Sequence, residues 1–314
     1  MTGRPSNVDV MGEYFSFGNL AIDDLVFADG TTSWRVAGGA AMYSALGMAV
    51  WAGTAATVAP FGPDYPCEAL QGIEFVSKRR LPASMRNWGL YEEDGSRHFV
   101  SRWASSDWEA ASPQIDDLDG GPYVNCHIGP MPWNCASVLI DALRERGART
   151  LSLDIHDRKL AGVTIDDYVA LVHRVDVFLP STQDVGEYLP GLSAHEALRE
   201  LRARLPGVKV IGIKRGGDGV IVHAAGDSEI ISVPSASYGT VDITGAGDAF
   251  CGGFLVGYAQ EGDALEGALR GSISAAYAIS APSASGLLAV NRAEARERMN
   301  ALRSGVTRLP FDAP

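Results

Sequence analysis

Cysteine is scarce in this chain of 314 residues, and its scatter excludes two kinds of scaffold. The four cysteines, Cys67, Cys126, Cys135 and Cys251, form neither a CxxC pair nor a Cys/His cluster. The sequence therefore predicts no disulfide framework and no zinc site, and it favours a reducing, cytoplasmic location. The first residues also lack the apolar run of a secretory signal peptide.

Basic residues are few as well. The chain has 26 Lys and Arg against 38 Asp and Glu, which gives a net charge of −12 and a pI near 4.9. Such an acidic chain is a poor match for nucleic acid or an anionic membrane, so neither is expected as a partner. An anionic substrate would need a local basic patch.

One uncharged stretch, residues 36–63, imitates a membrane span, since it exceeds the roughly 20 residues that a span needs. Five glycines interrupt the stretch. Its pattern is that of a small-residue helix followed by a buried strand, so we expect both elements to lie inside a soluble core.

What the sequence does contain is an alternation of strand and helix patterns. Strands are predicted at residues 123–128, 150–155 and 176–179, with a helix over 133–146. This alternation predicts an α/β fold with a mostly parallel sheet and helices on both faces. No repeat or linker divides the chain, so residues 1–314 are expected to form one domain.

Two β-hairpins are predicted before this alternation begins. The first turns at Asp29-Gly30, and the second turns within residues 93–96. They are expected to form a small β lid, with segments at about 19–36 and 85–105, over one edge of the sheet.

A turn of small residues opens a helical pattern near the C-terminal end. Gly245, Ala246 and Gly247 stand where the helix begins, and Asp248 lies in its first turn. The unpaired N–H groups and the positive dipole end of such a helix favour an anion. Taken alone, the motif fits equally well a tight turn whose aspartate merely complements the dipole.

A second glycine turn, residues 216–219, follows a strand predicted at 208–213. Neither turn spells GxxxxGK[ST] or GxGxxG, which argues against a P-loop and a standard dinucleotide fold. Backbone donors for phosphate beside a carboxylate suit transfer of a phosphoryl group to a hydroxyl.

Residues 242–248, D-I-T-G-A-G-D, resemble the signature D-T-x-G-A-G-D of the ribokinase or PfkB family of sugar and nucleoside kinases. Ile243 replaces the usual threonine. Gly38-Gly39 resemble the family's N-terminal Gly-Gly motif, and residues 214–219 look like its x-x-G-x-x-G nucleotide loop. Gly18 and Asp23 are similar to its strand-end pair, so four anchors in family order span nearly the whole chain.

The resemblance implies a ribokinase-like three-layer sandwich with a small β lid. It also implies an ATP-dependent phosphotransferase that phosphorylates a hydroxyl of a small sugar or polyol. Asp248 would be the base, and the amides of Gly245, Ala246 and Gly247 would form the anion hole. Because family lids often pair between subunits, a homodimer through the lid is implied as well.

The same resemblance assigns the binding residues. Those near the acceptor would be Asp23, Gly38, Gly39 and Tyr43, and those near ATP would be Lys214, Gly216 and Gly219. The adenine would lie towards residues 275–285. Tyr43 replaces an asparagine that contacts sugar in ribokinase itself, which argues against ribose; the alternative for this aromatic is packing in the core.

Two metal roles follow by resemblance. The family's Asn-x-x-Glu appears here as residues 181–184, S-T-Q-D, so Asp184 would act on Mg²⁺ through water. The alternative is that Ser181 only caps a helix. Asp242 matches a position that helps to hold a monovalent cation such as K⁺.

Two other functions remain open. A nucleoside kinase is one, because Trp103 and Trp108 near the lid offer aromatic faces for a base. A non-catalytic, ligand-binding relative is the other, because Ile243 and the altered Asn-x-x-Glu depart from the family pattern. His127 and His156 end predicted strands without a partner at metal spacing, so local hydrogen bonds are expected for each.

Overall fold

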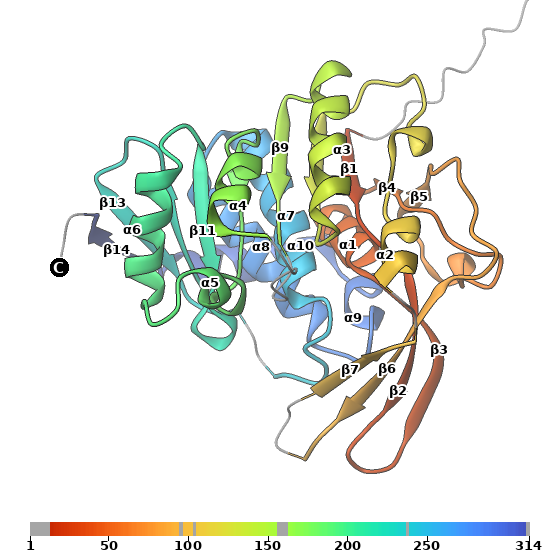
Figure 1. Ribbon diagram of the computed structural model, residues 1–314. Helices are drawn as coiled ribbons and strands as arrows, with labels where there is room; N and C mark the ends of the chain where they lie inside the picture. The colour runs from red at the N-terminus through yellow and green to blue at the C-terminus, as the bar shows by residue number, and fades with distance from the viewer. Residues whose placement is uncertain (1–12, 94–96, 103–104, 156–162, 237–238, 312–314) are drawn as a thin grey trace, which may run out of the picture.

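The chain folds into two sheets and the helices that cover the larger one (Figure 1). This computed structural model describes residues 13–93, 97–102, 105–155, 163–236 and 239–311. Trp103 and His156 therefore lie outside the described residues.

The larger sheet has ten strands in the order β14-β13-β12-β11-β10-β9-β8-β1-β4-β5. From β5 to β11 in this order the strands run parallel, and β12, β13 and β14 are added antiparallel. The mostly parallel sheet is thereby confirmed. The strands are Tyr14–Phe17 (β1), Ala55–Val58 (β4), Ile73–Phe75 (β5), Asn125–Ile128 (β8), Thr150–Leu153 (β9), Val177–Phe178 (β10), Val210–Lys214 (β11), Val220–Ala224 (β12), Glu229–Val233 (β13) and Thr307–Pro310 (β14).

Helices pack on both faces of this sheet, which makes three layers. Side chains alternate along each strand, so Phe15 and Phe17 of β1 enter one core with α3, α4 and α6. The opposite face is covered by α1, α7 and α8, with α10 outside them. The helices are Ala40–Ala52 (α1), Ser105–Ala111 (α2), Trp133–Glu145 (α3), Ile165–Val172 (α4), Thr182–Tyr188 (α5), Ala194–Arg204 (α6), Ala246–Glu261 (α7), Ala264–Ala278 (α8), Ser285–Leu288 (α9) and Arg292–Arg303 (α10).

The backbones of helices α1 and α7 approach each other closely at glycine residues. A Cβ on Gly47 would lie 2.3 Å from the carbonyl oxygen of Ala249, and one on Gly252 would lie 2.0 Å from that of Ser44. Any larger side chain would push the helices apart. The small residues of both helices thus allow the backbones to meet.

The uncharged stretch 36–63 is explained by this packing. It contains α1 and β4, most of whose residues are buried in the core. Among the described residues, the structure has no helix that is both long and apolar enough to cross a membrane.

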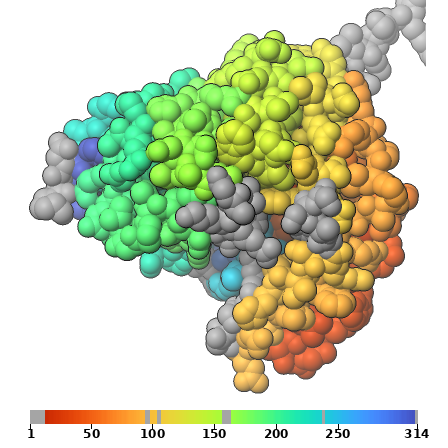
Figure 2. Space-filling view, in the orientation of Figure 1, coloured from red at the N-terminus to blue at the C-terminus, as the bar shows by residue number. Residues whose placement is uncertain are grey.

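The smaller sheet has the order β3-β2-β6-β7. Its strands are Ala21–Val26 (β2), Thr32–Gly38 (β3), Met85–Tyr91 (β6) and Arg97–Ser101 (β7). Both predicted hairpins are present, and β2 joins them by pairing parallel with β6. We call these four strands the lid; they extend below the main body at one side (Figures 1 and 2).

Candidate active site

The site lies at the edge where the parallel strands end. β1 pairs with β4 on one side and β8 on the other, so the strand order reverses there, and ligands of open α/β sheets bind beyond the strand ends at such a point. The chain places four polar residues just after, or at, strand ends along this edge: Asn19, Asp154, Ser181 and Lys214.

The turn that opens α7 is held in a conformation that suits glycine. Gly245 is the N-cap residue with φ 73°, in the left-handed region. A Cβ on Gly245 would lie only 2.1 Å from Cγ of Tyr43. Because Gly245 has no side chain, no side-chain hydrogen bond caps the first turn, which also contains the half-buried Asp248.

Asp242 stabilises this turn through hydrogen bonds to its carboxylate. One carboxylate oxygen accepts hydrogen bonds from the Thr244 N–H at 2.9 Å and the Tyr91 hydroxyl at 2.7 Å, and the other accepts one from the Ser283 N–H at 2.9 Å. Burial raises the pKa of Asp242, but these hydrogen bonds outweigh burial and lower it overall. A bound monovalent cation at Asp242 remains a prediction.

Lys214 brings a positive charge to the same turn. It ends β11, and its Nζ lies 3.4 Å from where a Cβ of Gly247 would stand. The ammonium pairs with the carboxylate of Asp154 and lies 3.6 Å from Sγ of Cys251. Burial lowers the pKa of Lys214, but Asp154 more than offsets this, so the pKa is raised and the ammonium stays charged at neutral pH.

Asp154 is the buried partner in this pair. Burial raises its pKa to about 7, although the charge of Lys214 opposes the shift. The negative charges of Asp184 and Asp248 raise it further. Lys214 is therefore a basic group at this edge, paired with Asp154; its contact with an anionic substrate remains a prediction.

Asp184 takes part in a capping box. Its carboxylate accepts a hydrogen bond from the Ser181 N–H at 2.6 Å, and the Ser181 hydroxyl accepts one from the Asp184 N–H at 3.2 Å. The capping alternative for Ser181 is thus confirmed. In the described part of the chain, no three His, Cys, Asp or Glu side chains are placed to hold a metal together.

The predicted acceptor residues lie close together. Asp23 in β2 is 5% exposed, and its carboxylate accepts a hydrogen bond from the Asn87 amide at 2.9 Å. A Cβ on Gly38 would lie 2.1 Å from Oδ2 of Asp23, and one on Gly39 would lie 2.3 Å from the carbonyl oxygen of Asn19. Glycine at both positions therefore lets the start of α1 approach Asp23 and the end of β1.

Tyr43 links these residues to the turn of α7. Its ring is 2% exposed and lies under Gly245, and its hydroxyl is close enough to Asp23 and Asp242 to feel their charges. Burial raises the pKa of Tyr43 well above its usual value, so the hydroxyl is neutral. The structure shows the packing role for Tyr43; contact with an acceptor remains a prediction.

The second glycine turn lies after β11. Gly216 has φ 57°, and Gly219 has φ 79° with no room for a Cβ, which would lie 2.1 Å from the carbonyl oxygen of Val233. A pocket of about 600 Å³ opens between the segment before Asp242 and the helices α8 and α10. Its lining residues are Gly239, Thr240, Val241, Ala276, Ser280, Glu294 and Arg298.

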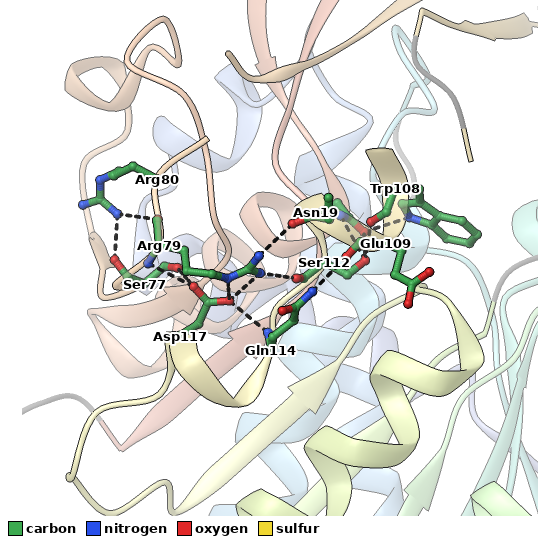
Figure 3. A network of polar contacts seen from close by, with 10 residues as sticks. Asn19, Ser77, Arg79, Arg80, Trp108, Glu109, Ser112, Gln114 and Asp117 are labelled. Carbon is green, nitrogen blue, oxygen red and sulfur yellow. Dashed lines mark hydrogen bonds and ion pairs between the residues drawn. The ribbon is translucent and has the colours of Figure 1, made fainter. Parts of the chain in front are cut away.

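A polar network lies beside the end of β1, next to the predicted acceptor residues (Figure 3). The Trp108 indole N–H donates to the side-chain oxygen of Asn19 at 2.9 Å, and the Ser112 hydroxyl donates to the Trp108 carbonyl oxygen at 2.7 Å. Arg79 binds the Ser112 carbonyl oxygen and the fully buried Asp117. Trp108 is therefore fixed beside the end of β1, and stacking on a base stays a prediction.

Three residues of this site were not chosen from the sequence. Asp154 lies one residue before the end of the strand predicted at 150–155, and that position at a parallel sheet edge is a usable signal. Asn87 and Tyr91 lie four places apart along β6, on the face of Asp23. Alternation along the strand offers this signal only once the pairing of β2 with β6 is known.

The sequence profile of the pfkB family carbohydrate kinases matches residues 109–290, more than half of the chain. The chain belongs to the pfkB family of carbohydrate kinases. It is thus a phosphotransferase, as the signature at residues 242–248 predicts, and the non-catalytic alternative loses its support.

Known proteins similar to this pfkB family member include a cytidine kinase of Thermococcus kodakarensis, which is 28% identical over 81% of this chain and 90% of its own. Among solved structures, a probable sugar kinase of Rhizobium etli superposes with a TM-score of 0.74 at 17% identity, covering 93% of this chain and 99% of its own. A nucleoside kinase of Methanocaldococcus jannaschii, from the ribokinase family, gives 0.69 at 16% identity, covering 92% and 98%. The ribokinase-like fold is confirmed.

Proposed function

We propose that the protein, as a single kinase domain over residues 1–314, transfers the γ-phosphoryl group of ATP to a hydroxyl of a small polyhydroxylated acceptor. The observation that supports this most is the charge arrangement at the start of α7. The Lys214 ammonium lies beside Gly247, and Asp248 stands in the same turn. A phosphate-binding turn and a carboxylate therefore share one helix end.

In the proposed reaction, Asp248 takes the proton of the acceptor hydroxyl while the oxygen of that hydroxyl forms a bond to the γ-phosphorus. The bond between that phosphorus and the bridging oxygen of ADP breaks, and ADP leaves with the electron pair. The amides of Gly245, Ala246 and Gly247, together with Lys214, stabilise the negative charge on the phosphoryl oxygens. The lid would exclude water from the site, because water that reached the γ-phosphorus would hydrolyse ATP.

The nucleotide is proposed to lie across the second glycine turn. Gly216 and Gly219 would approach its phosphates, and the pocket that includes Ala276 and Ser280 would take the adenine. A putative ribokinase II of E. coli with a similar fold was solved in complex with ATP and Mg²⁺.

Mg²⁺ fits the carboxyl groups at this edge. It prefers oxygen ligands and keeps several waters, so it does not need three protein ligands in one place. Asp184, buried and near the Lys214 pair, would hold it through water. When bound, Mg²⁺ neutralises phosphate charge. We further propose K⁺ at Asp242, whose buried carboxylate stays ionised because the hydrogen bonds from Thr244, Tyr91 and Ser283 lower its pKa.

For the acceptor we propose a nucleoside, bound between Asp23, Gly39 and Asp248. The support is the cytidine kinase that matches 81% of this chain, together with the aromatic face of Trp108 next to Asn19. A free sugar or polyol is the second candidate, because the family is one of carbohydrate kinases and a probable sugar kinase shares the fold.

An ADP-release assay with ATP and Mg²⁺ separates the candidates. The panel is cytidine, adenosine, inosine, ribose, fructose and ribitol. The fastest release is expected with a nucleoside. Faster release with fructose, ribose or ribitol would overturn the nucleoside proposal, and no release above the acceptor-free rate with any compound would overturn the proposed transfer.

We also propose a homodimer through the outer face of the lid. Trp88 and Val100 are cross-strand partners on that face, each 42% exposed, and Leu90 is 37% exposed. Exposed apolar side chains that cluster in this way mark interaction surfaces. Light scattering is expected to give a dimer for the wild type and a monomer for Trp88→Glu; a monomeric wild type at micromolar concentration would contradict the proposal.

A further inference from the structure

Tyr91 reaches from the lid to the turn that precedes α7. It is the last residue of β6, and the register of β6 against β2 places it on the same face as Asn87, the hydrogen-bond partner of Asp23. Its ring lies 5.0 Å from that of Phe27, which follows β2. The inner face of the lid therefore ends in an aromatic pair above the site.

The Tyr91 hydroxyl makes two contacts that lie 151 and 153 residues away in sequence. It donates to a carboxylate oxygen of Asp242 at 2.7 Å and lies 2.8 Å from the hydroxyl of Thr244. Thr244 immediately precedes Gly245, the N-cap of α7. A single lid hydroxyl thus contacts both residues that set the backbone of the proposed anion hole.

A second contact joins the lid to the same turn. Ser283, whose N–H donates to Asp242, also donates its hydroxyl to the Ala37 carbonyl oxygen of β3 at 3.4 Å. Ser283 has φ 56°, a left-handed conformation that a residue other than glycine rarely adopts. Asp242 is therefore the point at which both lid hairpins meet the turn of α7.

We propose that Tyr91 is a positioning residue that couples the lid to the anion hole. With the lid over the site, the Tyr91 hydroxyl holds Asp242 and Thr244 in place, and the amides of residues 245–247 then face the phosphate. With the lid away, this hydroxyl is withdrawn and the turn loosens. This inference rests on the proposed phosphoryl transfer, and it explains how the site delays transfer until the acceptor is covered.

Tyr91→Phe is the direct test, because it keeps the ring beside Phe27 and removes only the hydroxyl. The loss of a hydrogen bond to a charged group is expected to lower kcat roughly tenfold or more. The affinity for a non-hydrolysable ATP analogue without acceptor should stay at the wild-type value. The matched control is Tyr123→Phe, which removes a hydroxyl that bonds to Asp119 at the opposite edge of the sheet. It is expected to keep the wild-type kcat.

A second variant tests the shared contact. Thr244→Val removes the other hydroxyl, and the double variant with Tyr91→Phe is expected to lose less than the product of the two single losses. Multiplicative losses would overturn the coupling, as would a wild-type kcat in Tyr91→Phe.

Amide hydrogen exchange tests the proposal without relying on activity. Backbone amides of residues 239–248 are expected to exchange at least several times faster in Tyr91→Phe than in the wild type or Tyr123→Phe. Equal exchange in all three proteins would overturn the positioning role even if phosphoryl transfer is real. A wild type that is inactive with every acceptor, but shows the exchange difference, would overturn the proposed function and keep the positioning role.

Discussion

Helices α5 and α7 begin at the same edge of the sheet, and both carry an aspartate at the third position of the first turn. In α5 the N-cap is Ser181, and Asp184 hydrogen-bonds back to its N–H. In α7 the N-cap is Gly245, which has no side chain to cap the N–H of Asp248. The serine side chain caps a donor of the first turn, whereas glycine has no side chain that could do so. The cap residue therefore separates a helix start that stabilises the fold from one that suits a phosphate.

Apart from removal of the proposed base, the largest effect is expected from a side chain placed in the uncapped turn of α7. Gly245→Ala places a Cβ 2.1 Å from Cγ of Tyr43 at a φ of 73°, so the turn must shift. Loss of the anion-hole geometry should lower kcat by roughly 10²- to 10³-fold. The matched control is Gly191→Ala, whose φ is 83° and whose Cβ meets nothing within 4 Å. Similar kcat values for the two variants would show that the turn of α7 has no special role.

A smaller effect on activity is expected at α5. Two variants there separate the capping role of Ser181 from the negative charge of Asp184. Ser181→Ala should cost about 1 kcal/mol in the free energy of unfolding, measured with urea, and leave the Mg²⁺ requirement unchanged. Asp184→Asn keeps the shape but removes the charge, and it should raise the Mg²⁺ concentration at half-maximal activity severalfold. If Asp184→Asn leaves the Mg²⁺ concentration at half-maximal activity unchanged, Asp184 acts only in the capping box.

The last effect concerns stability rather than activity, at the sheet face beneath α7. His127 of β8 is fully buried, with its ring nitrogen 2.9 Å from the Ser152 hydroxyl, as expected for local hydrogen bonding. Burial lowers its pKa to about 3, and Lys214 adds to the shift. Between pH 6.5 and 3, His127 is protonated in the unfolded chain but neutral in the folded protein. The free energy of unfolding therefore falls as the pH falls. Going from pH 7 to 5 should cost about 2 kcal/mol at this residue.

The measurement is urea unfolding of the wild type and His127→Gln at both pH values. The raised pKa of Asp154 acts in the opposite direction, since its folded form keeps a proton that the unfolded form releases. The difference between the two proteins isolates His127, and the variant should lose less stability at pH 5. Parallel pH profiles would exclude a buried neutral imidazole.

Local signals predicted much of this structure. The helix α3, Trp133–Glu145, lies where the pattern of residues 133–146 predicts a helix. The two hairpins follow from their turn residues, and the start of α7 follows from its glycines. Each of these features depends on neighbours in sequence, which is why composition and spacing suffice.

Contacts between distant segments could not be predicted in this way. The parallel pairing of β2 with β6 depends on how two hairpins meet, and neither hairpin encodes it alone. The contact of Tyr91 with Asp242 depends on that pairing in turn. The strand β14 and the short helices α2 and α4 were also not predicted, because each is brief and is stabilised by packing rather than by its own pattern.

The most direct test of the difference between α5 and α7 is the acceptor-dependent kcat of Asp248→Asn. Its control is Glu196→Gln, at the same position in the exposed capping box of α6. Removing the base should lower kcat by roughly 10²- to 10⁴-fold while the ATP affinity and the circular dichroism spectrum stay at wild-type values. Glu196→Gln should keep the wild-type kcat. A folded Asp248→Asn protein with the wild-type kcat would contradict the central claim that the bare first turn of α7 carries out the transfer.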